Sequence, residues 1–127
     1  MIGTITRHGI LLVDDDQRIL HFSRLKLMAS GYNVVTAMTG QGALTMIESK
    51  EPDVVVLDLR MPGMGGLEVL KIVRSSSDLP VIVISAATDL AEEALVAGAD
   101  DFISKPFDPD ELVRRIAQTL ESKNRRN

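Results

Sequence analysis

The side chains best suited to chemistry in this chain stand at or just after the ends of short apolar segments. They are four acids, one hydroxyl and one amine, in chain order Asp14, Asp15, Asp16, Asp58, Ser85 and Lys105. Carboxylates bind hard divalent cations, and an aspartate can also be the nucleophile that receives a phosphoryl group. A lysine and a serine can donate hydrogen bonds to the oxygens of such a group. These residue types indicate metal-assisted phosphoryl chemistry, provided that the fold brings them together.

Five apolar segments of strand length alternate with segments of helical spacing. The expected strands are residues 10–13, 34–37, 54–57, 81–84 and 101–103. Three of the intervening segments place apolar residues three or four positions apart, which predicts amphipathic helices. Their apolar stripes are Ile19, Phe22, Leu25 and Ala29; Leu67, Leu70 and Val73; and Leu112, Ile116 and Leu120. Residues 40–50 and 89–97 are rich in helix formers and complete a set of five predicted helices.

The ends of several predicted helices carry recognisable signals. Gly31 and Gly98 follow the first and fourth helices, where glycine commonly ends a helix. For the fifth helix, Asp108 can cap the first turn, Pro109 fits the first helical position, and Glu111 stands where a capping box has an acid. These signals support the helix boundaries independently of the apolar pattern.

The predicted strands are continuous apolar runs, which is typical of parallel strands covered by helices on both faces. Five strand-helix units therefore predict an α/β fold, a flavodoxin-like doubly wound sandwich with a five-stranded parallel sheet of order 2-1-3-4-5. In this order the first and third strands are neighbours at the point where the strand order reverses. We therefore expect Asp14 and Asp15 to lie beside Asp58.

Three carboxylates at one edge of a sheet repel one another unless a cation offsets their charge. Ligands that are all oxygen suit Mg²⁺, with Mn²⁺ as a substitute, and Mg²⁺ leaves coordination positions open for water and phosphate. Asp16 is better suited to capping the first helix and is left out of the metal site. Lys105 and Ser85 would then face the bound phosphoryl group.

The whole chain sets broader limits. Its 127 residues fit one domain, and we expect an extension at 1–8, the functional domain at 9–122 and a tail or linker at 123–127. The chain has no cysteine, which fits a reducing compartment, and no apolar run long enough to span a membrane. We expect a cytoplasmic protein. A formal net charge of -4 argues against direct nucleic-acid binding by this domain.

Four motifs occur in a fixed order: LLVDDD, VVVLDLRMPGMGG, VIVISA and DFISKPF. In sequence and separation they resemble the receiver domain of bacterial two-component response regulators, from about Gly9 to Leu120. The resemblance implies that Asp58 is the phospho-acceptor, that Asp15 binds Mg²⁺ directly, and that Asp14 holds the ion through water. It adds the backbone carbonyl of Arg60 as a further ligand.

The resemblance also assigns roles around the phosphoryl group. Ser85 corresponds to the hydroxyl residue that contacts this group, and Lys105 to the cation that pairs with Asp58 or its phosphate. Phe102 corresponds to the aromatic residue that changes rotamer on activation. The bond between Lys105 and Pro106 is commonly cis in this family.

The resemblance implies a signalling switch rather than an enzyme. The phosphodonor would be a sensor histidine kinase or a phosphotransfer protein. The output domain or effector would dock on the face formed by the fourth helix, fifth strand and fifth helix, and a homodimer could form on phosphorylation. The cognate kinase, the output and the oligomeric state are not determined by the sequence.

The chain departs from the usual family pattern at several positions. Phe102 lacks the tyrosine hydroxyl common there, so switching would depend on packing alone. Gly65 replaces a usually polar residue. Arg60 places a long cation beside the phosphoryl group, where it would pair with a neighbouring acid or screen attacking water. Ala86 and Ala87 are small, so we expect Arg60 and Ala87 to tune the phosphoryl lifetime.

Two other functions use the same residues. A phosphatase of the haloacid dehalogenase type also has a strand-end aspartate and Mg²⁺, but it would need a second acid where this chain has Arg60. A receiver-like module that binds partners without phosphorylation is the other alternative. The acid pair, Asp58, Ser85 and Lys105 together disfavour it, and an Asp58→Asn variant with unchanged activity would favour it.

Overall fold

The computed structural model describes residues 7–126 and contains the predicted alternation of strands and helices. The strands are β1 (Gly9–Val13), β2 (Asn33–Ala37), β3 (Val54–Leu57), β4 (Val81–Ser85) and β5 (Asp101–Ser104). The helices are α1 (Gln17–Ala29), α2 (Gly40–Lys50), α3 (Gly66–Arg74), the 3₁₀ helix η1 (Thr88–Leu90), α4 (Ala91–Val96) and α5 (Pro109–Arg126). The fourth predicted helix thus begins with a 3₁₀ turn.

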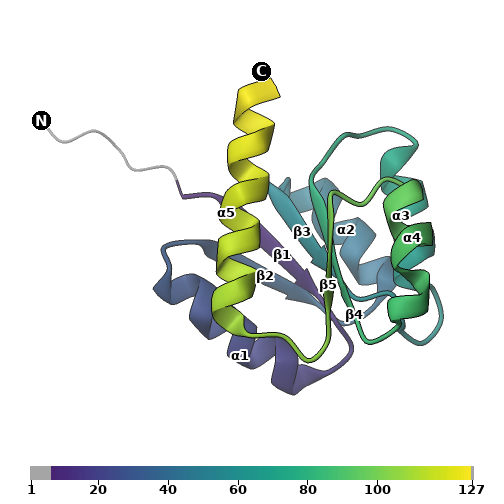
Figure 1. The fold of residues 1–127 in the computed structure, drawn as a ribbon, viewed down its shortest axis with the longest axis horizontal. Helices are drawn as coiled ribbons and strands as arrows, with labels where there is room; N and C mark the ends of the chain where they lie inside the picture. Colours follow the sequence, from purple (N-terminus) through teal and green to yellow (C-terminus); the bar gives the residue numbers. More distant parts are fainter. Residues whose placement is uncertain (1–6, 127) are drawn as a thin grey trace, which may run out of the picture.

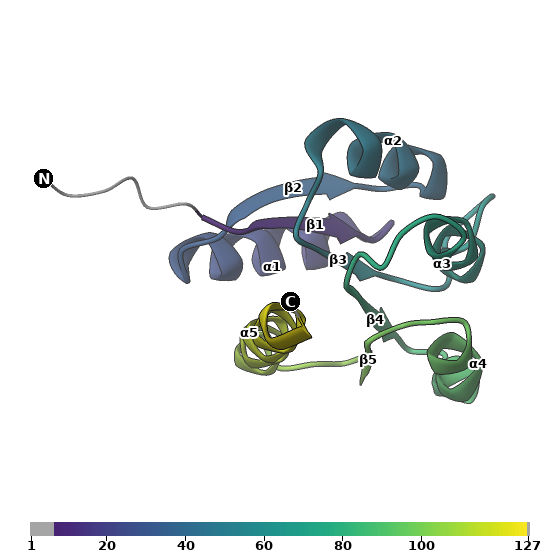
Figure 2. The same ribbon diagram turned by 90° about the horizontal axis from the view of Figure 1, so that it is seen from above.

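The five strands form one parallel sheet in the order β2-β1-β3-β4-β5, which confirms the predicted fold class. Helices α1 and α5 cover one face, and α2, α3 and α4 cover the other, as Figures 1 and 2 show. The carboxyl ends of the strands therefore share one edge, at the lower side of Figure 1.

Alternate residues of the central strands supply two apolar cores, one on each face of the sheet. The core under α1 and α5 contains Ile10, Leu12, Val54, Val56, Ile82 and Ile84. The core under α2, α3 and α4 contains Leu11, Val13, Val55, Leu57, Val81 and Val83. All residues of β1, β3 and β4 except Gly9 are buried, so the continuous apolar runs do mark strands covered on both faces.

Most of the predicted helix ends are confirmed. Gly31 and Gly98 have φ values of 97° and 111°, in the left-handed region that favours glycine. Asp16 caps α1, because its side chain accepts a hydrogen bond from the Arg18 backbone N–H. Asp108 Oδ1 likewise accepts from a backbone N–H in the first turn of α5. The capping box is not completed, since the next predicted member, Glu111, binds Arg115 instead.

The predicted buried face of α1 is wrong. The helix buries Leu20, Ser23 and Leu27, whereas Phe22 and Leu25 of the predicted stripe are 47% and 51% exposed. Two apolar sets on neighbouring faces compete in this helix, and the polar residue at position 23 conceals the set that packs against the sheet. The stripes of α3 and α5 are confirmed in their main residues, because Leu70, Val73, Leu112, Ile116 and Leu120 are all buried.

The two predicted end segments of the chain are described only in part. Residues 1–6 of the predicted extension and Asn127 lie outside the described residues. Helix α5 continues through Arg126, so most of the segment predicted as a tail or linker is helical. Among residues 7–126, no helix combines the length and the apolar character needed to cross a bilayer.

Candidate functional site

The register of the sheet aligns the strand ends that carry the predicted site residues. Val13 is aligned with Leu57, and the N–H of Asp58 donates to the Val13 carbonyl oxygen at 2.9 Å. Asp14 and Asp58 therefore leave two neighbouring strands side by side. On the other side of β3, the N–H of Lys105 donates to the Ser85 carbonyl oxygen at 3.0 Å. The sheet thus places four of its five strand ends, those of β1, β3, β4 and β5, around one site.

The loop after β3 is held closely against the backbone of Asp58. The N–H of Gly66 donates to the Leu59 carbonyl oxygen at 2.9 Å, and a Cβ at position 66 would clash with the Asp58 carbonyl oxygen. Gly63 has a φ of 74°, which a side chain would make strained. The glycines of the MPGMGG motif therefore let α3 begin directly beside Asp58.

Asp14, Asp15 and Asp58 form a compact acidic cluster. Each offers a carboxylate oxygen, and these oxygens all lie within 4.8 Å of one another. Asp14 and Asp58 are each only 5% exposed, whereas Asp15 is exposed. Asp14 Oδ1 accepts a hydrogen bond of 2.9 Å from the Asp16 backbone N–H, which fixes the orientation of that carboxylate.

Lys105 supplies the positive charge of the cluster. Its Nζ lies 2.8 Å from Asp14 Oδ2 and 3.3 Å from Asp58 Oδ2. The Lys105 side chain is 17% exposed, so both ion pairs are partly shielded from solvent. The peptide bond between Lys105 and Pro106 is cis, as the family resemblance implied. One lysine therefore bridges two of the three carboxylates.

The pKa values of two site residues respond to this arrangement. Burial raises the pKa of the Asp58 carboxyl above its ordinary value, Lys105 acts in the opposite direction, and the charge of Asp14 raises it further. Burial lowers the pKa of Lys105, but its hydrogen bond to Asp14 and the two negative charges outweigh burial. The pKa of Lys105 is therefore raised overall, and the amine stays protonated at neutral pH.

The donor set of the cluster fits a hard divalent cation. Three carboxylates share one positive charge from Lys105, so the site carries an excess of negative charge that such an ion would offset. All candidate ligand atoms are oxygens, which is the ligand type that Mg²⁺ prefers. Asp15 is exposed at the rim, so an ion bound there would keep positions open to water or phosphate.

The remaining predicted residues differ in how deeply they are buried. Ser85 is fully buried, and its Oγ accepts a hydrogen bond of 3.0 Å from the N–H of Ala87. Ala87 is buried, whereas Ala86 is exposed. Phe102 is half-buried and packs against the core under α2, α3 and α4. The Ser85 hydroxyl proton can still rotate toward an acceptor in the site.

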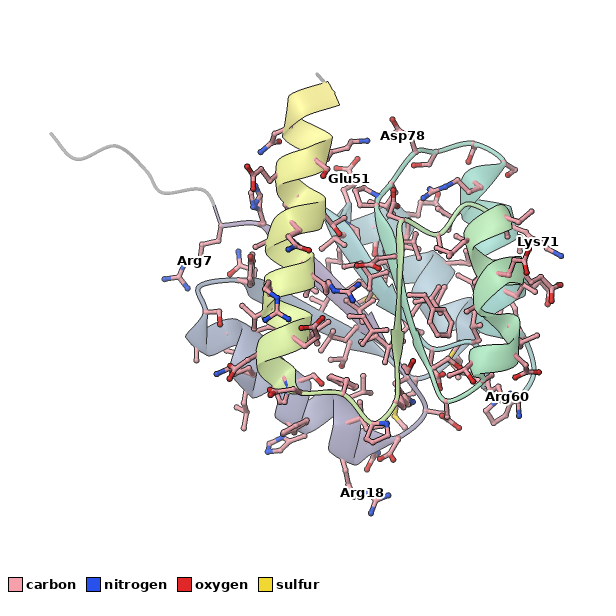
Figure 3. The ribbon with its side chains drawn as sticks, in the orientation of Figure 1. Arg7, Arg18, Glu51, Arg60, Lys71 and Asp78 are labelled. Carbon is pink, nitrogen blue, oxygen red and sulfur yellow. The ribbon has the colours of Figure 1, made fainter. Side chains whose placement is uncertain are left out.

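Arg60 lies at the rim, where Figure 3 shows its side chain projecting outward near the lower end of α4. Its backbone N–H is 3.5 Å from Asp58 Oδ1, and its guanidinium lies 3.7 Å from Asp89 Oδ1. Sequence reasoning did not name Asp89 as this partner. Its position four residues after Ser85, in the segment that follows a strand end at the same sheet edge, was the available signal.

The fold and this site define a receiver domain of the response regulators. A family model described as "Response regulator receiver domain" matches residues 10–117, and the chain belongs to this family. Receiver domains of this family act as signalling switches that work with histidine kinases and output domains, and they bind Mg²⁺ at an acidic pocket. The acidic cluster described above is compatible with such a pocket.

Curated relatives are longer than this chain. It is 47% identical over 109 residues to the transcriptional regulatory protein KdpE of Mycobacterium tuberculosis, which covers 84% of this chain and 48% of the relative. It is 39% identical over 116 residues to the DNA-binding response regulator MtrA of Mycobacterium leprae, which covers 90% and 52%. The chain therefore spans about half the length of these relatives.

Solved receiver domains match over nearly their whole length. The receiver domain of the Francisella response regulator 1452 has a TM-score of 0.87 at 35% identity, covering 92% of this chain and 99% of that one. A CheY-like receiver domain protein from Methanospirillum hungatei has a TM-score of 0.90 at 30% identity, covering 96% and 100%. Both comparisons support the family assignment by fold as well as sequence.

Proposed function

We propose that this receiver domain accepts a phosphoryl group on Asp58 in a Mg²⁺-dependent reaction. The observation that carries the proposal is the difference between the two buried carboxylates. Asp14 receives hydrogen bonds of 2.9 and 2.8 Å from the Asp16 N–H and Lys105, whereas Asp58 has contacts of 3.5 and 3.3 Å to the Arg60 N–H and Lys105. Asp58 is therefore the buried carboxylate whose oxygens are most available to attack phosphorus.

The phosphodonor would be a phosphohistidine of a sensor histidine kinase or of a phosphotransfer protein. A carboxylate oxygen of Asp58 attacks phosphorus, an O–P bond forms, and the P–N bond to the imidazole breaks. The leaving nitrogen takes up a proton, which yields neutral histidine and an aspartyl phosphate. Bound at Asp15, Asp58 and the Arg60 carbonyl, and through water at Asp14, Mg²⁺ would neutralise charge on the phosphoryl oxygens.

The other site residues would stabilise the product. The new group carries about -1.5 to -2 charges, so Lys105 would transfer its contact from the Asp58 carboxylate to the phosphoryl oxygens. Ser85 would turn its hydroxyl toward the same group, and Phe102 would follow into the space that this movement opens. The resulting change on the α4-β5-α5 face would alter the binding of an output domain or effector. The same face would also serve for a homodimer formed on phosphorylation.

The wider assignment follows from the family. We propose residues 9–122 as the functional receiver, with 1–8 as an extension and 123–127 as the tail or start of a linker. The names of the KdpE and MtrA relatives favour a transcriptional output reached through a separate DNA-binding part, without nucleic-acid contact by the receiver itself. The cytoplasm is the proposed location. The domain would catalyse only its own phosphorylation and dephosphorylation.

The direct test uses purified protein, Mg²⁺ and acetyl phosphate. Intact-mass spectrometry is expected to show one adduct of about 80 Da, the mass of one phosphoryl group, that is labile in base and maps to Asp58. The adduct should not form when EDTA is present, nor in the Asp58→Asn variant. Asp53→Asn is the matched control, because it makes the same change at a carboxylate that accepts the Gly9 N–H outside the cluster. An adduct on another residue, or none, would refute the proposal.

A further inference from the structure

A small cavity adjoins the acidic cluster on the side covered by α1 and α5. Its volume is about 20 Å³, and its apolar walls include Leu12, Val56 and Leu112. Asp14 and Asp58 also line it. Asp14 stands two residues after Leu12, and Asp58 two residues after Val56, and both apolar residues belong to the core under α1 and α5. Because side chains alternate between the faces of a strand, residues two apart point to the same side, so the two carboxylates are directed toward this core.

The third polar group of this cavity is the hydroxyl of Ser23. This residue is on the buried face of α1 and is only 2% exposed. Within the described part of the chain, Ser23 Oγ is the buried side-chain polar atom that has no hydrogen-bond partner. A serine inside a helix commonly bonds the carbonyl four residues earlier, but Ser23 does not do so here. Ser23 lines the cavity, and its hydroxyl has no protein partner.

The size and lining of the cavity fit one water molecule. A buried water needs about 10 to 15 Å³ and two to four polar partners, and an apolar cavity of this kind stays dry without them. The polar residues that line the cavity, Ser23, Asp14 and Asp58, offer such partners, and each carboxylate has acceptor capacity beyond its present contacts. A bare metal ion is a poor fit, because most of the wall is apolar and cannot complete a coordination shell.

We propose that this cavity is a site for one internal water, which Ser23 Oγ holds against a carboxylate oxygen of Asp14 or Asp58. The water donates to the carboxylate and accepts from, or donates to, the hydroxyl. It joins α1 to the strand ends that carry the acids, which makes Ser23 a positioning residue for the cluster. This site does not depend on phosphorylation of Asp58, and it is tested in metal-free, unphosphorylated protein.

A high-resolution crystal structure provides the direct test. It is expected to show one water within about 3.2 Å of both Ser23 Oγ and a carboxylate oxygen of Asp14 or Asp58. In Ser23→Val the two added methyl groups should fill the cavity and exclude the water while the fold is retained. A dry cavity in the wild-type protein, with Ser23 Oγ turned to the Ile19 carbonyl, would overturn the proposal.

Double-mutant cycles test the positioning role. If the water links the groups, the Tm shifts of Ser23→Ala and of Asp14→Asn or Asp58→Asn should be non-additive by about 2 °C or more in at least one pairing. Ile84→Val is the matched control, since it alters the same cavity wall without a polar group, and the Ser23 cycles should exceed any non-additivity that its cycles show. Additive Ser23 cycles with both acids would show that Ser23 only packs.

Discussion

Asp58→Asn is predicted to stabilise the protein in metal-free buffer. The carboxylate oxygens lie within 4.8 Å of one another, and at this outer limit and an effective dielectric constant of about 20, two unit charges repel by about 3.5 kcal/mol. The Lys105 contact of 3.3 Å attracts by about 5 kcal/mol on the same basis. The variant relieves two repulsions, from Asp14 and Asp15, and loses one attraction. The net gain in unfolding free energy is about 1 to 2 kcal/mol once solvent screening at exposed Asp15 is included.

That gain corresponds to a rise in Tm of about 4 to 8 °C for a domain of this size. Lys105 is not left unpaired in the variant, because its contact of 2.8 Å with Asp14 remains. Mg²⁺ should change the comparison, since a ligand at 100 times its Kd stabilises a protein by about 2.7 kcal/mol. Wild type should gain this stabilisation and Asp58→Asn much less, so the difference in Tm closes as Mg²⁺ is added.

The same variant has a predicted pH dependence in metal-free buffer. Because the pKa of Asp58 is raised in the folded protein, the folded state binds more protons between the ordinary aspartate value of about 3.9 and the raised value. The unfolding free energy contributed by this group therefore falls as pH rises through that range. The advantage of Asp58→Asn should be absent below it and complete above it.

Thermal unfolding followed by circular dichroism, with EDTA or Mg²⁺, measures all three effects. Asp16→Asn is the matched control, because it removes a neighbouring charge outside the cluster and asparagine caps a helix equally well. Its Tm should equal that of wild type or lie slightly below it, because the exposed ion pair with Arg18 is lost, and its response to Mg²⁺ should match wild type. A lower Tm for Asp58→Asn in EDTA, or an equal Mg²⁺ response in both proteins, would refute the electrostatic description of the site.

Three further predictions concern Arg60, Lys105 and Arg74. Arg60→Ala should shorten the aspartyl phosphate lifetime by up to about fivefold because a cation that screens water is lost, and Asp89→Asn should lengthen it within the same limit. Time-resolved mass spectrometry measures both, and unchanged rates would contradict the tuning role. Lys105→Met should lose about 3 kcal/mol of unfolding free energy in EDTA and recover most of it with Mg²⁺, as urea titration would show. Arg74 donates hydrogen bonds to three backbone carbonyls and to Asp100. Arg74→Met should therefore lose about 2 to 4 kcal/mol of unfolding free energy without a change in Mg²⁺ binding. A loss below about 1 kcal/mol would contradict this prediction.

The fold could be predicted because local patterns and a general rule of sheet topology agree. Continuous apolar runs indicate parallel strands, and the order 2-1-3-4-5 then makes the first and third strands neighbours. From that point the convergence of Asp14 and Asp58 needs no further information, since both residues directly follow aligned strand ends. The cluster was therefore predictable from strand ends alone, although its distances and burial were not.

Side-chain partners that depend on tertiary packing were not predictable in the same way. The pairing of Arg60 with Asp89 joins the loop after β3 to η1, two segments that are far apart in the sequence and meet only in the folded chain. Glu111 carries the expected capping-box pattern, but Arg115 lies one turn later and takes its carboxylate. In both cases a local pattern allowed several partners, and the folded arrangement selected one of them.

The prediction that failed outright and the proposed water site have the same origin in Ser23. A serine among Leu20 and Leu27 interrupts the apolar stripe of α1, so periodicity alone favours the neighbouring face with Phe22 and Leu25. In the folded protein the same serine is buried without a hydrogen-bond partner and lines a small cavity next to Asp58. A polar residue at a core position is unfavourable unless it is satisfied. A local conflict of this kind is expected where a site requires it, and here it adjoins the acids of the candidate phosphorylation site.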